Sequence, residues 1–202
     1  MTTPHPRPDL GPPIPPDSLS VVLLSRGDGT FHWALGLALP ASDSDSTSSG
    51  ESTSTPDRRY AFRKLHATQL KGPSWESEDV VHDIEAMRAR KPVCVVVQIG
   101  CTDTGSTSSS ASLRTPDAVA RLVGAIPLAL PERETKESAF NCRVWVREAI
   151  RVLHDRGVVD IVDVDKLEEE FIGLGEENDA SVVQGGPYKV YWSRNAGVAR
   201  AG

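Results

Sequence analysis

Cysteine is scarce in this 202-residue sequence, and its few cysteines form no recognised pattern. Cys94, Cys101 and Cys142 make an odd number and contain neither a CxxC pair nor the Cys/His spacing of a zinc site. The spacing therefore indicates neither a disulfide framework nor a structural zinc centre, and we expect no metal or other cofactor. Unpaired thiols fit a reducing, cytoplasmic location.

Long basic runs and long apolar runs are also missing. Lys and Arg do not alternate with aromatic residues, and the net charge is −6, so we expect no binding to duplex nucleic acid. No segment approaches the roughly 18 apolar residues of a membrane span, and residues 1–18 lack the apolar stretch of a signal peptide. These absences predict a soluble protein that does not act at a membrane.

Three segments are too biased in composition to join a packed core. Residues 1–19 are dominated by proline, which predicts a disordered tail with a possible role in docking. Residues 41–58 and 102–116 are rich in serine and threonine, so we expect them to be loop insertions at the surface. The remainder predicts a single domain over residues 20–202.

Apolar periodicity predicts an α+β domain whose antiparallel sheet packs against helices. Asp28-Gly29 is a hairpin signal between two apolar runs, and the β-branched run at 93–100 is typical of a central strand. Pattern and capping signals together predict strands at 20–26, 31–39, 59–67, 93–100 and 188–192. The same signals predict helices at 77–90, 115–126, 140–157 and 163–175. Asp165 is a plausible N-cap of the last helix.

Cys142 lies in the first turn of the helix that follows Asn141, a favourable N-cap residue. Val146, Ile150 and Leu153 form an apolar stripe that includes the thiol, which we therefore expect at the edge of the core. Free backbone N–H groups and the positive end of the helix dipole favour a thiolate there, and they can stabilise an oxyanion. A buried structural thiol is the alternative.

An efficient cysteine nucleophile needs a nearby imidazole base. His154 lies about 18 Å along the helix from Cys142, too far to act on it. His32 alternates with small residues on its strand, and His66 lies on the following strand, where antiparallel pairing brings it toward His32. Core packing of His32 and surface exposure of His66 remain open as structural alternatives.

These residues resemble a known group of enzymes. FHWALGLAL, a following strand that ends in His66, and NCRVWV at a helix start look like the lecithin:retinol acyltransferase and NlpC-type superfamily, which has a circularly permuted papain-like fold. The resemblance implies Cys142 as the nucleophile, His32 as the base and His66 as the residue that orients His32.

The sequence thus predicts a cysteine-dependent acyl-transfer enzyme, an amide or ester hydrolase or an acyltransferase, that acts on a small-molecule or peptide acyl substrate through a thioester. Two alternatives stay open. One is aminoacyl transfer that builds a small peptide, and the other is a non-catalytic interaction module on the same fold.

Overall fold

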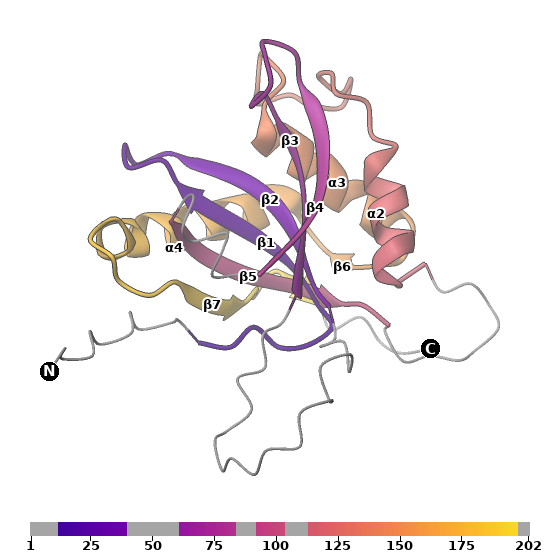
Figure 1. The fold of residues 1–202 in the computed structure, drawn as a ribbon. Coiled ribbons are helices and arrows are strands. Elements are labelled where there is room, and N and C mark those ends of the chain that lie inside the picture. The colour runs from indigo at the N-terminus through magenta and orange to yellow at the C-terminus, as the bar shows by residue number, and fades with distance from the viewer. Residues whose placement is uncertain (1–11, 40–60, 84–91, 104–112, 198–202) are drawn as a thin grey trace, which may run out of the picture.

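The computed structural model of this chain describes residues 12–39, 61–83, 92–103 and 113–197, and its architecture is mixed α+β (Figure 1). A six-stranded sheet has the order β4-β3-β2-β1-β5-β7, with every neighbouring pair antiparallel except β5 and β7. The strands are β1 (Ser18–Ser25), β2 (Phe31–Ala38), β3 (Ala61–Thr68), β4 (Glu76–Asp83), β5 (Val93–Cys101), β6 (Asp160–Ile161), β7 (Lys189–Trp192) and β8 (Ala196–Gly197), and the helices are α2 (Pro116–Gly124), α3 (Cys142–Asp155) and α4 (Val164–Val183). The predicted α+β class is therefore confirmed.

The β1–β2 hairpin forms as its turn sequence predicts. Gly27 and Gly29 adopt φ values of 80° and 77°, which residues with a side chain rarely adopt. Asp28 accepts hydrogen bonds from the backbone N–H and the hydroxyl of Thr30, at 3.0 and 2.6 Å. These local bonds fix the turn, and Ser25 then pairs with Phe31 at the start of the ladder.

β4 corrects the prediction of a helix over residues 77–90. Val80 and Val81 fit helical spacing, yet residues 76–83 form a strand that pairs with all of β3, from Ala61 opposite Asp83 to Thr68 opposite Glu76. Eight backbone pairings with a neighbouring strand outweigh a weak helical pattern, because tertiary context overrides local propensity. The remaining predicted helical residues, 84–90, lie outside the described part of the chain.

Strand alternation divides the large sheet into two faces, each with its own apolar cluster. The helix face carries Leu23, Trp33 and Leu35, which pack in one cluster with residues of α2, α3 and α4. The second face carries Ala34 and Phe62, which pack in a separate cluster that includes Ile14, Val96 and Tyr188. In Figure 1, α3 and α4 accordingly lie behind the strands.

Small residues set the spacing on both faces. A Cβ at Gly36 would collide with the ring of Phe62 on the second face. A Cβ at Gly175 of α4 would come within 2.8 Å of the Phe31 ring on the helix face. These two positions therefore need glycine for close packing, not for an unusual backbone angle.

Several predicted boundaries need correction. β1 begins at Ser18, Ile14 is 4 % exposed, and the Pro12 carbonyl accepts a hydrogen bond from Tyr188, so the described part of the predicted disordered tail contacts the domain through these residues. Asp163 caps α4, because its carboxylate accepts from the N–H groups of Asp165 and Lys166. Residues 1–11, the insertion at 41–58 and residues 104–112 of the second insertion lie outside the described residues.

Candidate functional site

Two imidazoles and a carboxylate form a continuous hydrogen-bonded chain across three strands. His32 Nε2 lies 2.6 Å from His66 Nδ1, and His66 Nε2 lies 2.7 Å from Glu78 Oε2. The β3–β4 register places His66 directly opposite Glu78. The expected approach of His66 to His32 is therefore confirmed, and Glu78 extends the contact. We call His32, His66 and Glu78 the imidazole chain.

Both histidines of the imidazole chain are buried, and the carboxylate of Glu78 determines which atoms donate and which accept. His32 is 7 % exposed and His66 1 % exposed. Burial raises the Glu78 pKa, but the hydrogen bond from His66, together with the charges of nearby Lys64 and Lys71, holds that pKa below its usual value. An ionised Glu78 can only accept, so His66 Nε2 donates to it. In neutral His66, Nδ1 is then the acceptor for the Nε2–H of His32.

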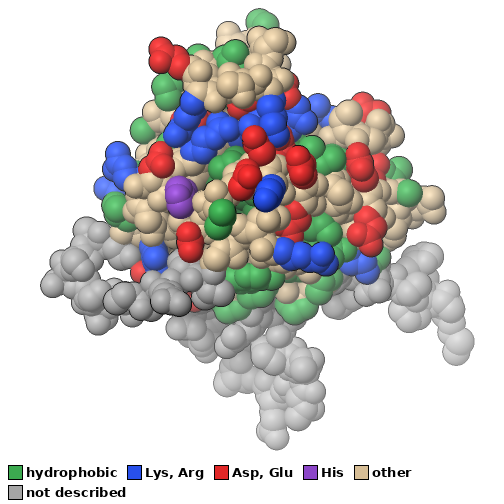
Figure 2. Space-filling view, turned by 180° about the vertical axis from the view of Figure 1, so that it is seen from behind, with side chains coloured by type: hydrophobic (Ala, Val, Ile, Leu, Met, Phe, Trp, Pro, Cys, Tyr) green, Lys and Arg blue, Asp and Glu red, His purple; other side chains and the backbone are tan. Residues whose placement is uncertain are grey.

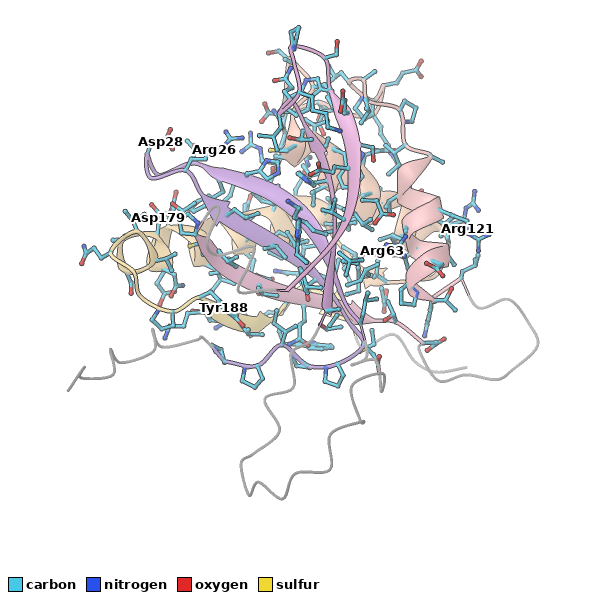
Figure 3. All side chains as sticks on the ribbon, viewed as in Figure 1. Arg26, Asp28, Arg63, Arg121, Asp179 and Tyr188 are labelled. Atoms are coloured by element: carbon cyan, nitrogen blue, oxygen red, sulfur yellow. The ribbon has the colours of Figure 1, made fainter. Side chains whose placement is uncertain are left out.

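Cys142 lies elsewhere, at the first residue of α3. Its side chain is buried, and Arg26 Nη2 lies 3.8 Å from the sulfur. Arg26 comes from the β1–β2 hairpin, next to Asp28 at the tip (Figure 3). A cavity of about 400 Å³ opens here and is lined by Arg26, Gly29, Thr30, Phe31, Trp33, Asn141, Cys142, Arg143, Ile172 and Glu176.

The N-terminal N–H groups of α3 are less available than the sequence suggests. The Asn141 side chain accepts from the backbone N–H of Arg143 at 2.9 Å and of Val144 at 3.0 Å, as predicted for an N-cap. A capped N–H cannot also bind a substrate oxyanion at full strength. The Arg26 guanidinium is the cation that contacts the thiol, and no pattern in the sequence points to it.

The contacts described for Cys142 do not include His32, although a nucleophile and its base were expected to meet. Phe31 and Trp33 line the cavity at the thiol and belong to the helix face of β2. His32 lies between them in sequence, so strand alternation turns its side chain to the second face. The small residues around His32 were expected to admit α3, but Phe62 fills the space above Gly36.

The other two cysteines differ from Cys142 in their surroundings. Cys94 is fully buried, its thiol donates to the Gly175 carbonyl, and burial with the nearby Asp179 raises its pKa to about 12. Cys101 is exposed, and partial burial with Asp17 and Asp103 raises its pKa. Both are therefore poorer nucleophiles than an ordinary thiol near neutral pH.

Glu78 and Arg26 are the two site residues that sequence reasoning missed. Glu78 would have emerged from reading 76–83 as a strand, since alternation then aligns it with His66. Arg26 adjoins the hairpin turn, and nothing in the sequence pairs it with a residue 116 positions away. The signal for Glu78 was present in the pattern, whereas that for Arg26 arises only on folding.

Within the described ranges, no cluster of three or more His, Cys, Asp or Glu side chains is arranged to hold a metal ion. The helices in those same ranges include none with the length and apolar character needed to cross a bilayer. Comparison of the chain with protein-family models gives no match, and no curated protein or solved structure matches it either.

Proposed function

We propose that this chain is a cysteine-dependent acyl-transfer enzyme that acts through a thioester on a small-molecule or peptide acyl substrate, on a permuted papain-like variant of the α+β fold. The observation that carries the proposal is the environment of Cys142. Its sulfur lies at a helix start, 3.8 Å from the Arg26 guanidinium, beside a cavity of about 400 Å³. Three free thiols fit a reducing cytoplasmic setting.

In the proposed reaction, Cys142 Sγ forms a bond to the acyl carbon while the carbonyl electron pair moves to oxygen. Arg26 and Arg143 both line the cavity, and because Arg143 is paired with Glu137 and Glu168, Arg26 is the cation that stabilises that oxyanion. Collapse of the tetrahedral adduct breaks the bond to the alcohol or amine, which takes up the proton that the thiol released. Water or a second nucleophile then attacks the thioester and regenerates the thiol.

The thiol proton needs an acceptor other than His32, which faces the opposite side of the sheet. Glu176 is the carboxylate among the residues that line the cavity, and it is exposed to solvent. We propose that the proton passes to Glu176 or through it to water. Hydrolysis, acyl transfer and aminoacyl transfer differ only in the acceptor that resolves the thioester.

A non-catalytic interaction module is the second candidate, and the imidazole chain favours it. His32 and His66 are buried and bonded to each other, and Glu78 holds the far end, as in a structural polar network. On this reading the histidines stabilise the sheet, and Cys142 is a core-edge thiol.

The first test is iodoacetamide labelling of the native protein from pH 5 to 9, followed by peptide mass spectrometry. We expect Cys142 to label faster than Cys94 and Cys101, and Arg26→Gln to slow Cys142 several-fold while leaving Cys101 unchanged. His32→Gln should leave the Cys142 rate unaltered. Preferential labelling of Cys101, with Cys142 inert in folded protein, would refute a nucleophilic Cys142.

A second test separates enzyme from interaction module. The protein is incubated with a panel of activated esters, and intact-mass spectrometry follows an acyl adduct that hydroxylamine removes. An adduct on Cys142 that is absent in Cys142→Ser supports the enzyme. A Cys142 that alkylates readily yet forms no thioester with any ester of the panel favours the interaction module.

A further inference from the structure

A second hollow lies between α2 and α3, away from the thiol. Its volume is about 550 Å³. Its lining comes from the residue two positions before the α2 N-cap Thr115, from α2 and the segment after it, and from the middle and C-terminal end of α3: Leu113, Ala118, Arg121, Leu122, Ala125, Ile126, Pro127, Glu148, Val152 and Arg156. We call it the α2–α3 groove.

The walls of the α2–α3 groove are mostly apolar. Ala118 and Ile126 are buried at its base, and Leu122 and Val152 are partly buried and pack against the main core. Leu113 is 44 % exposed at one edge. Apolar area left open beside a well-packed core favours an apolar ligand, since contact removes that area from water.

The rim of the groove carries net positive charge. Glu148, the acidic residue of the lining, is already paired with Arg133 at 2.6 Å and lies 3.6 Å from Arg151. In the described part of the chain, neither Arg121 nor Arg156 forms an ion pair, and Arg121 donates only to the backbone carbonyl of Asp117. Figure 3 shows Arg121 on the side of α2 that faces away from the sheet.

We propose that the α2–α3 groove binds a compact amphiphilic organic anion, with an apolar body against Leu122 and Val152 and one carboxylate or sulfonate between Arg121 and Arg156. The volume falls within the usual range for small-molecule sites. Two guanidiniums that find no acidic partner among the described residues complement the anionic group, and Arg forms directed bonds to oxyanions.

This site is separate from the Cys142 cavity. Cys142 is the first residue of α3 and Arg156 its C-cap, so the helix rise separates them by about 20 Å. Binding in the groove therefore does not depend on the thiol. Loss of acyl transfer in Cys142→Ser and loss of binding in a groove variant are distinguishable results.

The test uses two fluorescent probes that share an apolar body. 8-Anilinonaphthalene-1-sulfonate carries an anionic group, and N-phenyl-1-naphthylamine is its neutral counterpart. We expect the native protein to bind both and the double variant Arg121→Gln/Arg156→Gln to weaken the sulfonate about fivefold, with the neutral probe little changed. Leu122→Gln should weaken both probes.

Controls make the result specific. Arg194→Gln removes an exposed arginine outside the groove, and Cys142→Ser removes the thiol, so neither should alter either affinity. Each variant is first shown to unfold cooperatively in urea. Sulfonate binding that is absent from the native protein, or that is equal in native protein and the arginine double variant, would overturn the proposal.

Discussion

Glu78 determines how protons are arranged in the imidazole chain. Its carboxylate accepts from His66 Nε2, and this bond fixes which nitrogen of His66 is left to receive the Nε2–H of His32. A single carboxylate at the edge of the sheet thus determines the tautomer of one buried ring and the donor role of another. Removing the Glu78 carboxylate should therefore change the hydrogen bonding of both His66 and His32.

We predict that Glu78→Gln lowers the free energy of unfolding at pH 7 by about 1–2 kcal/mol, because a charge-assisted bond to a buried ring is lost. The Glu78 pKa is held below its usual value, so its contribution is complete above the unfolded carboxyl pKa of about 4.3. As pH falls through the lower folded value, that contribution disappears. Urea unfolding at pH 7, 5 and 3 should show the difference from the native protein narrowing toward acid.

Glu76→Gln is the matched control on the same strand. Glu76 pairs with Lys71 at 3.3 Å, and both side chains are well exposed, so this pair contributes less than about 0.5 kcal/mol. An equal loss of stability in the two variants at pH 7 would mean that the imidazole chain has no special role in stability.

At the scale of elements, a buried ionic cluster joins α3 to α4 and to the segment before α3. Arg147 is 2 % exposed and donates to Glu134 at 2.9 Å and to Asp165 at 2.6 Å. Glu168 of α4 lies 3.7 Å from the same guanidinium. Figure 2, which views the molecule from behind, shows basic and acidic side chains intermingled across this side.

We predict that Arg147→Met lowers the free energy of unfolding by about 3 kcal/mol, because it removes the cation that the fully buried Glu134 side chain shares with Glu168, and Arg151, 3.5 Å from Glu134, compensates only in part. Arg147→Met/Glu134→Gln should recover part of the loss. Arg133→Met, which removes a half-exposed arginine that pairs with Glu148, should cost less than about 1 kcal/mol. A double variant no more stable than Arg147→Met in urea unfolding would contradict the explanation.

The elements also show what the sequence could predict. α3 has a strong N-cap in Asn141 and an unbroken apolar stripe, so its position and its buried side followed from local patterns. The pattern of β4 fits either a helix or a strand, and its pairing with β3, the preceding strand, decides between them. Interactions within about one helical turn can be predicted from a single sequence. Pairing between strands depends on the whole sheet and cannot be predicted in this way.

At the scale of the molecule, the sheet separates the thiol from the imidazoles. The sequence correctly predicted the β1–β2 hairpin and the approach of His66 to His32, because both follow from strand alternation and antiparallel pairing. It did not determine which face of β2 receives α3. Both faces of that strand suit a helix by composition, and long-range packing, which includes Trp33 against Phe171 of α4, selects one.

We therefore predict that a chemical change at Cys142 does not affect the imidazole chain. Alkylation of Cys142, or Cys142→Ser, should leave the imidazole NMR signals of His32 and His66 unchanged, because strand alternation places these rings on the face of the sheet opposite the thiol. Glu78→Gln serves as the positive control and should shift both imidazoles through the 2.7 and 2.6 Å bonds. The contrary result is a His32 signal that moves when Cys142 is alkylated, by about as much as it moves in Glu78→Gln. That result would show that the thiol and the imidazole meet in solution. It would thereby restore His32 as the base of Cys142.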